Sequence, residues 1–232
     1  MNRRYYWPLA ILVTFAVWSC RDAVAPPAAP AAPEGPRFSS VGPEAADGAD
    51  LSDGDDDSAA ETGASILQQA ATAPPLETYH VAFWLSRDKA TQVIVRYRPA
   101  AGESEGQPFL LFDVPKGALR TAGGGAKLAK KDSILITMTI DPASFLVDFQ
   151  PSGVLFTSPK PATLVFWYQN AEQDLNGDGV VNGADRVLLD QLRIIYRRDG
   201  HAHWHRTRSM KGWTWPYVFS PIRHFSSYAV SW

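Results

Sequence analysis

The chain is poor in cysteine and in long apolar runs. Cys20 is the only cysteine among 232 residues, so no disulfide can form within the chain. The apolar run from Leu9 to Trp18 is shorter than the ~20 residues that a membrane-spanning helix needs. The sequence therefore excludes a fold held together by internal disulfides. We also expect no transmembrane span.

The sequence lacks a large excess of charge of either sign, because its formal net charge is −2. Residues 76 to 232 contain 18 Lys and Arg and 14 Asp and Glu, which leaves this part near +4. A nucleic-acid-binding domain is expected to carry a clustered basic face. We therefore predict that nucleic acid is not a partner.

Recognisable catalytic spacing is also missing. No nucleophile is paired with a base, and no two carboxylates have an enforced separation. Glu103 and Glu105 fall in a Gly-rich hairpin and Asp141 falls in a turn, where solvation explains them. The sequence therefore predicts a protein that is not an enzyme.

Residues 1 to 20 have the features of an export signal, because Arg3 and Arg4 precede the apolar run. The end of this segment, Val17-Trp18-Ser19-Cys20, resembles the lipobox at which bacterial lipoproteins are cleaved and acylated on the cysteine. The resemblance implies a lipid anchor at Cys20 and a membrane as partner. We expect a lipoprotein exported to the bacterial cell envelope. Arg21 gives no inner-membrane retention signal of the Asp type, so we expect the outer membrane.

Residues 21 to 75 are rich in Ala, Pro, Gly and Asp, and they include an acidic run from Asp47 to Asp57. Such a composition buries too little apolar surface to offset the entropy of ordering the chain. We predict a disordered tether that holds the following domain away from a membrane.

Residues 76 to 232 consist of short β-branched and aromatic segments separated by Gly, Pro, Asp and Lys clusters, which is typical of strands. We expect strands near residues 78–86, 91–98, 108–114, 133–140, 144–150, 163–169, 193–198, 202–208, 217–219 and 227–231, and a short helix over 184–192. The predicted fold is mainly β: an antiparallel β-sandwich with one short helix that follows a calcium loop. A parallel sheet would need more crossover helices.

Three stretches of this domain carry a family resemblance: Val114 to Leu119, Phe149 to Phe166, and His224 to Val230. In their order and spacing they resemble the β-sandwich domain shared by zonula-occludens proteins, netrin receptors, ankyrins and many bacterial surface proteins. The resemblance implies a structural or protein-interaction module without catalytic residues. It also implies that the calcium loop is an insertion.

Residues 174 to 185, DLNGDGVVNGAD, match the spacing of an EF-hand calcium loop. Oxygen-bearing side chains fall at loop positions 1, 3, 5, 9 and 12, and a glycine at position 6 permits the sharp turn. The expected ligands are Asp174, Asn176, Asp178, the carbonyl of Val180, Asn182 and Asp185. The alternative is an ordinary turn, which also favours Asp, Asn and Gly.

Position 12 departs from the usual pattern, because Asp185 stands where EF-hand loops carry glutamate. Aspartate at this position resembles dockerins, but dockerins carry two such loops and this chain has one. A cellulosome role is therefore not implied. We expect calcium to stabilise the fold, because a sensor usually needs a pair of helices that opens.

Two further groups of residues support weaker alternatives. His201, His203 and His205 would share one face of a strand, where they could bind zinc or copper in a metalloenzyme. Trp204, Trp213 and Trp215 lie among basic residues and could stack on a glycan. Core packing is the simpler prediction for Trp213 and Trp215.

Overall fold

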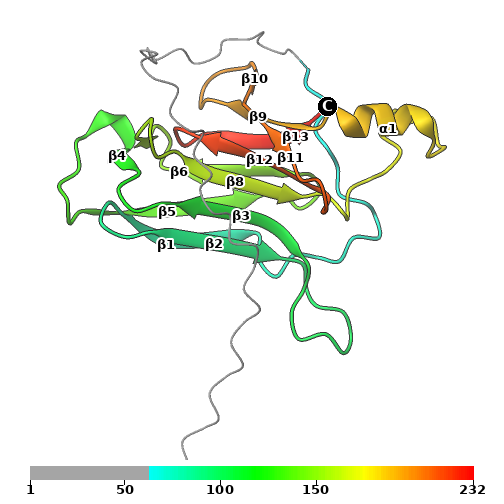
Figure 1. The fold of residues 1–232 in the computed structure, drawn as a ribbon, viewed down its shortest axis with the longest axis horizontal. Helices are drawn as coiled ribbons and strands as arrows, with labels where there is room; N and C mark the ends of the chain where they lie inside the picture. The colour runs from blue at the N-terminus through cyan, green and yellow to red at the C-terminus, as the bar shows by residue number, and fades with distance from the viewer. Residues whose placement is uncertain (1–62) are drawn as a thin grey trace, which may run out of the picture. The chain divides into compact units, whose positions relative to one another are not determined.

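The computed structural model describes residues 63 to 232, which form two antiparallel β-sheets packed face to face (Figure 1). The six-stranded sheet has the order β1 (His80–Ser86), β5 (Ser133–Ile140), β6 (Leu146–Gln150), β13 (Ser227–Ser231), β9 (Arg193–Arg197) and β10 (His205–Arg206). The five-stranded sheet has the order β11 (Met210–Lys211), β12 (Tyr217–Ile222), β8 (Ala162–Trp167), β3 (Pro108–Val114) and β2 (Thr91–Arg96). The predicted mainly-β, antiparallel sandwich is confirmed.

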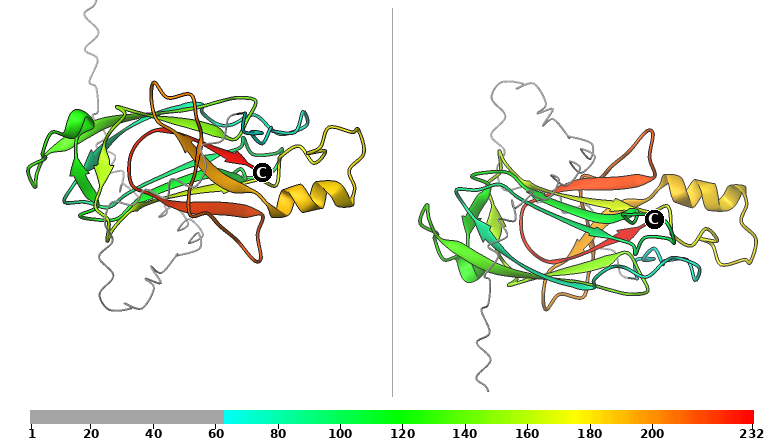
Figure 2. Two further views of the ribbon diagram at one scale, coloured as in Figure 1. Left: turned by 90° about the horizontal axis from the view of Figure 1, so that it is seen from above. Right: turned by 90° about the horizontal axis from the view of Figure 1, so that it is seen from below.

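Four further elements complete the described part of the chain. β4 (Leu119–Thr121) pairs with β7 (Leu155–Phe156), and η1 (Gly123–Gly125) is a single helical turn. The helix α1 (Gly183–Asp190) projects with its preceding loop from one end of the sandwich (Figure 2). No helix among residues 63 to 232 is both long and apolar enough to cross a membrane.

Strand β5 shows why the sequence forms a sandwich. Ile136, Met138 and Ile140 point inward and are at most 2% exposed, whereas Leu135 on the other face is 48% exposed. Alternate side chains of a strand point to opposite faces, so the apolar positions of this strand fall on one side. Burying that side against the second sheet is the main favourable term for the fold.

Aromatic rings join the two sheets. Phe112 of β3 and Phe149 of β6 have ring centroids 4.9 Å apart, although they belong to opposite sheets. Phe225 lies on Phe149 at the same separation, with the ring planes inclined by only 8°. Such pairs contribute beyond simple burial, by about 0.5–1.5 kcal/mol each. The centre of the core is therefore built from phenylalanine.

The described chain joins the sandwich earlier than Leu76. Leu67 is fully buried, its N–H donates to Val230 at 2.9 Å, and its carbonyl accepts from Phe145 at 2.9 Å. The described residues before Leu76, where the predicted domain starts, therefore pack on the sandwich through the buried Leu67 side chain as well as through backbone hydrogen bonds. The export signal, Cys20 and the predicted tether up to residue 62 lie outside the described residues.

Candidate calcium-binding loop

The loop of residues 174 to 185 lies between β8 and α1 and is anchored at both ends. Leu175, at the start, is 8% exposed and belongs to the main core, as does Leu192 after the helix at 3%. Between these anchors Asn176, Asp178 and Asn182 are exposed. The core thus fixes the ends of the loop and leaves most of its polar side chains at the surface.

Asp174 organises the first half of the loop. One carboxylate oxygen accepts the N–H groups of Gly177 at 2.9 Å and Asp178 at 3.1 Å, and the other accepts that of Gly179 at 2.7 Å. Gly177 and Gly179 have φ of 71° and 84°, a left-handed conformation that other residues rarely adopt. The chain therefore wraps around the carboxylate at loop position 1.

Asn176 and Asp178 form a second set of bonds within the same turn. The side-chain oxygen of Asn176 accepts the N–H of Asp178 at 2.9 Å, and its amide nitrogen donates to the Asp178 carboxylate at 2.8 Å. The other oxygen of Asp178 accepts the N–H of Val180 at 2.8 Å. The structure thus brings the predicted ligands at positions 1, 3 and 5 into one turn.

Asp185 and Asn182 close the loop onto α1. The Asn182 side-chain oxygen accepts the N–H of Ala184 at 2.7 Å, and Asp185 accepts the N–H of Asn182 at 2.8 Å, which together form a capping box. The second oxygen of Asp185 accepts the N–H groups of Leu175 at 2.8 Å and Asn176 at 3.2 Å. Asp185 therefore connects the two ends of the loop.

These contacts determine the charge state of Asp185, which is 3% exposed. The N–H of Asn182 makes the largest contribution that holds the pKa of the Asp185 carboxyl below its ordinary value, and the N–H groups of Asn176 and Leu175 add to it, against desolvation that raises it. Hydrogen bonds to the charged form lower the pKa of a carboxyl group. Asp185 is therefore ionised at neutral pH.

Two of the predicted ligands, the Val180 carbonyl and the Asn182 side chain, are hydrogen-bonded to each other. The Val180 carbonyl accepts the side-chain amide of Asn182 at 2.9 Å, so both groups take part in bonds within the loop. Among residues 63 to 232, no three His, Cys, Asp or Glu side chains are gathered as a metal site. The sequence pattern predicts Asn182 only as a calcium ligand and does not predict its role as the N-cap of α1. The Asn-x-x-Asp spacing of a capping box could have revealed that role.

The prediction that one strand carries His201, His203 and His205 on the same face is wrong. Only His205 lies in a strand, β10, and its ring is stacked on Tyr196 with centroids 5.2 Å apart. His201 and His203 lie outside any strand, so the chain does not place the three rings on one strand face. The turn at Gly200 is followed by irregular chain at residues 201 to 203, and the strand begins only at His205.

The three tryptophans of the proposed glycan-binding surface also differ in their exposure. Trp204 is buried at 6% exposure, whereas Trp213 and Trp215 are 103% and 67% exposed. The prediction that Trp213 and Trp215 pack in the core is wrong. Both precede β12, where the strand alternation does not apply.

Comparison of the chain with protein families, characterised proteins and solved structures finds no match.

Proposed function

We propose that residues 174 to 185 bind one calcium ion, which stabilises a non-catalytic β-sandwich module of a cell-envelope lipoprotein. The observation that supports this most directly is the arrangement of Asp174, Asp178 and Asp185. All three lie within twelve residues, at the spacing of a calcium loop, on a backbone that folds around the first of them.

The donor set suits a hard cation. Every proposed ligand offers oxygen, and calcium takes six to eight oxygen ligands in a flexible geometry. A carboxylate has roughly four acceptor positions, and Asp178 uses two of them within the loop. Asp174 and Asp185 use three each, so every carboxylate keeps acceptor capacity. The residues therefore fit calcium in number, charge and chemistry.

A bound ion would join the two halves of the loop through the side chains of Asp174, Asn176, Asp178 and Asp185. Asn182 and the Val180 carbonyl would complete the set. An ion that binds only the folded state stabilises it by about 2.7 kcal/mol at a hundredfold excess over its Kd. Millimolar calcium outside the cytosol can fill even sites with Kd of about 10⁻⁴ to 10⁻³ M. The expected export and the expected site are therefore consistent.

Two features support a structural role for the ion. One helix, α1, flanks the loop among the described residues, and both loop ends are anchored in the core by Leu175 and Leu192. Sensor proteins need a helix pair that opens when calcium binds. The family resemblance of the sandwich supports a role in protein interaction or surface structure.

Calorimetric titration of the full chain with calcium chloride tests the proposal. The wild type is expected to bind one ion, and the variant with Asp174→Asn and Asp178→Asn is expected to lose at least tenfold in affinity, about 1.4 kcal/mol. Asp190→Asn is the matched control, because Asp190 lies at the exposed end of α1, outside the loop. Equal binding by wild type and double variant would contradict the proposal.

Glycan binding is a second candidate, favoured by the exposure of Trp213 and Trp215. Large exposed aromatic rings offer stacking surfaces, and these two share one hairpin connection between β11 and β12. The buried Trp204 no longer belongs to this surface. Affinity electrophoresis in soluble polysaccharides tests it: Trp213→Ala with Trp215→Ala should abolish any retardation of the wild type, and an unretarded wild type would contradict it.

A further inference from the structure

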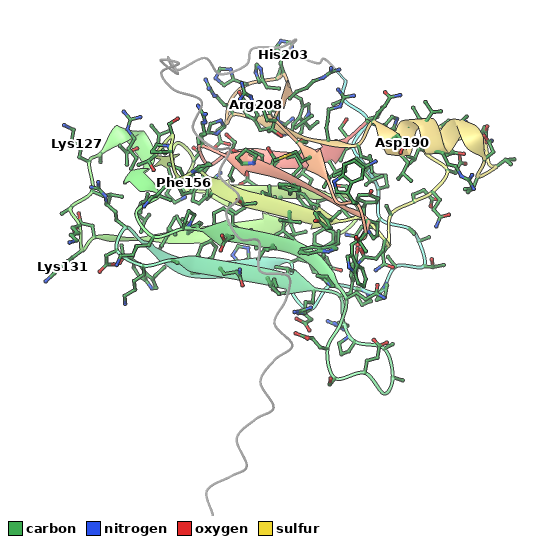
Figure 3. The ribbon with its side chains drawn as sticks, viewed as in Figure 1. Lys127, Lys131, Phe156, Asp190, His203 and Arg208 are labelled. Carbon is green, nitrogen blue, oxygen red and sulfur yellow. The ribbon has the colours of Figure 1, made fainter. Side chains whose placement is uncertain are left out.

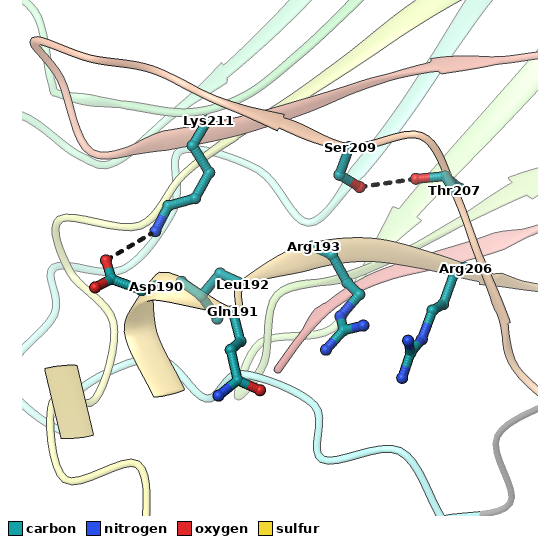
Figure 4. A pocket seen from close by; sticks show the side chains of 8 residues that line it. All are labelled: Asp190, Gln191, Leu192, Arg193, Arg206, Thr207, Ser209 and Lys211. Carbon is teal, nitrogen blue, oxygen red and sulfur yellow. Dashed lines mark hydrogen bonds and ion pairs between the residues drawn. The ribbon is translucent and has the colours of Figure 1, made fainter. Parts of the chain in front are cut away.

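The edge strands on one side of the sandwich, β10 and β11, are short and joined to each other. Each has two residues, and the chain between them crosses from the six-stranded to the five-stranded sheet. The Thr207 hydroxyl donates to the Ile194 carbonyl at 2.8 Å, and the Ser209 hydroxyl accepts the Ile194 N–H at 2.7 Å. The two hydroxyls are hydrogen-bonded to each other at 2.9 Å (Figure 4). His203 and Arg208 mark this closed side in Figure 3.

The other side of the sandwich has β1 and β2 as its edge strands. β2 is partly covered, because the Glu77 N–H donates to the Arg96 carbonyl at 2.9 Å and the Arg98 N–H donates to the Pro75 carbonyl at 2.8 Å. Arg96 also forms an ion pair with Glu105 at 2.8 Å. Charged side chains on an edge strand disfavour pairing with a further strand. β2 is therefore protected at its end.

β1 lacks the usual protection of an edge strand. It has seven residues, none of which is Asp, Glu, Lys, Arg or Pro. Its pairing with β5 is regular over all seven residues, without a bulge. Proteins commonly protect an edge strand by a short length, a charge, a proline or a bulge. The absence of all four marks β1 as a strand to which another strand can be added.

The hydrogen bonds to β5 determine which backbone groups of β1 face the free edge. The Ile140 N–H donates to the Tyr79 carbonyl at 2.8 Å. Opposite residues of an antiparallel pair alternate between hydrogen-bonded and non-hydrogen-bonded positions. The residues of β1 that direct their N–H and C=O groups away from β5 are therefore His80, Ala82, Trp84 and Ser86.

The chain supplies its own partner only at the first of these residues. The Thr78 hydroxyl accepts the His80 N–H at 3.2 Å and donates to the His80 carbonyl at 2.8 Å. Among residues 63 to 232, the edge-facing backbone groups of Ala82, Trp84 and Ser86 have no hydrogen-bond partner. These three residues present donors and acceptors in the alternation that a neighbouring strand would match.

The side chains of this edge suit a second copy of the same strand. Antiparallel pairing of all three unpaired residues centres on Trp84, which then lies opposite Trp84 of the second copy. Ala82 lies opposite Ser86, so small residues flank the two large rings. Trp84 is 65% exposed, and Leu135, its neighbour on β5, is 48% exposed. Opposite aromatic side chains stabilise a strand pair.

The charges at the two ends of β1 are complementary in the same arrangement. Glu77 precedes the strand, whereas Arg87 and Lys89 follow it, and all three are exposed. Asp88, between the two cations, accepts the Ser86 hydroxyl at 2.5 Å. Antiparallel pairing brings the acidic start of each strand near the basic end of the other. A parallel arrangement would bring like charges together instead.

We propose that β1 pairs with β1 of a second copy of this chain, in antiparallel orientation and centred on Trp84. The interface is then symmetric, with the same residues contributed by both copies. It joins the two six-stranded sheets into one continuous sheet. The dimer is reversible, because few residue pairs form it. No residue of β1 belongs to the loop of residues 174 to 185, so the dimer goes beyond the proposed calcium site and does not depend on it.

Sedimentation of the full chain over a range of protein concentrations, in a chelator, tests this pairing independently of calcium. The wild type is expected to show a monomer–dimer equilibrium. Ala82→Pro removes an N–H that faces the free edge and leaves the β5 pairing intact, so it should raise the dissociation constant at least about tenfold. Ala82→Ser keeps the N–H and is the matched control. Equal dissociation constants for these two variants, or a wild type that is monomeric throughout, would overturn the proposal.

A charge exchange tests the orientation without changing the strand itself. Glu77→Lys should raise the dissociation constant roughly threefold, because it places like charges together at both ends of the interface. Adding Lys89→Glu to the same chain should restore the wild-type value. Failure of the second change to restore the dimer would overturn the antiparallel arrangement. Ile94→Lys, at a 40% exposed site on β2, should leave the dimer unchanged, and its loss in this variant would assign the contact to the other edge and overturn the proposal.

Discussion

The sandwich core and the loop of residues 174 to 185 are held together by different kinds of interaction. The core is built from apolar rings such as Phe112, Phe149 and Phe225, which contact one another without polar groups. The loop is built from carboxylates that accept backbone N–H groups, as Asp174 and Asp185 do. The difference teaches that the two regions should respond to different perturbations: the core to lost volume, and the loop to pH and calcium.

The largest effect is expected in the core. Phe149→Ala removes a fully buried ring that contacts Phe112 and Phe225, so it should lower the free energy of unfolding by about 3–5 kcal/mol. Urea unfolding with and without calcium measures it, and the loss should be the same in both. Trp84→Ala, at a site 65% exposed, is the control, with a change of at most about 0.5 kcal/mol.

A smaller effect is expected at the start of α1. Asn182→Ala removes the acceptor for the N–H of Ala184, so it should cost about 1 kcal/mol even in a chelator. Asn182→Asp keeps an N-cap acceptor and should retain the stability of the wild type. Urea unfolding of both variants provides the comparison, and equal stability of the alanine variant would show that the cap does not stabilise the loop.

The loop should also make stability dependent on pH. The folded-state pKa of Asp185 is lowered, chiefly by the N–H of Asn182, so its contribution is present above the ordinary aspartate pKa. This contribution is lost as the pH falls through the lowered folded-state value. In thermal unfolding in chelator from about pH 6 to pH 2, Asp185→Asn should therefore show a smaller decline in midpoint than the wild type. Parallel curves would exclude Asp185 as a source of the acid sensitivity.

The smallest effect is expected outside both regions. Asp190 is 86% exposed and lies 3.7 Å from Lys211, so Asp190→Asn should change the free energy of unfolding by less than about 0.5 kcal/mol. The change should shrink further in high salt. A cost above 1 kcal/mol in urea unfolding would indicate that this ion pair contributes more than exposure allows.

The sequence predicts several long strands well because each has a complete apolar pattern between turn residues. The ranges of β3, β5 and β13 agree with the predicted ones, since each alternates or is continuously apolar between turn residues. β4, β7 and β11 have two or three residues each, which is too short for any periodicity. Such strands are defined by tertiary pairing, and a local pattern does not reveal them.

The loop shows the same division between local and tertiary information. The spacing of Asp174, Asp178 and Asp185 is local and can be read from the sequence. The burial of Asp185 and its bonds to Leu175 and Asn176 depend on how the loop closes, which spacing does not specify. The exposure of Trp213 is the opposite case, because an aromatic residue outside a strand has no fixed inner face.

Thermal unfolding of wild type and Asp178→Ala, each in calcium and in chelator, tests the central claim most directly. For each protein the midpoint in calcium is compared with the midpoint in chelator. The variant lacks the hydrogen bonds that Asp178 accepts within the loop under both conditions, so their loss cancels in this comparison. With calcium in hundredfold excess of Kd, the wild type should gain about 2.7 kcal/mol, or roughly 5 to 10 °C in midpoint, and the variant should gain little. A wild-type midpoint that is the same in calcium and in chelator would contradict the account.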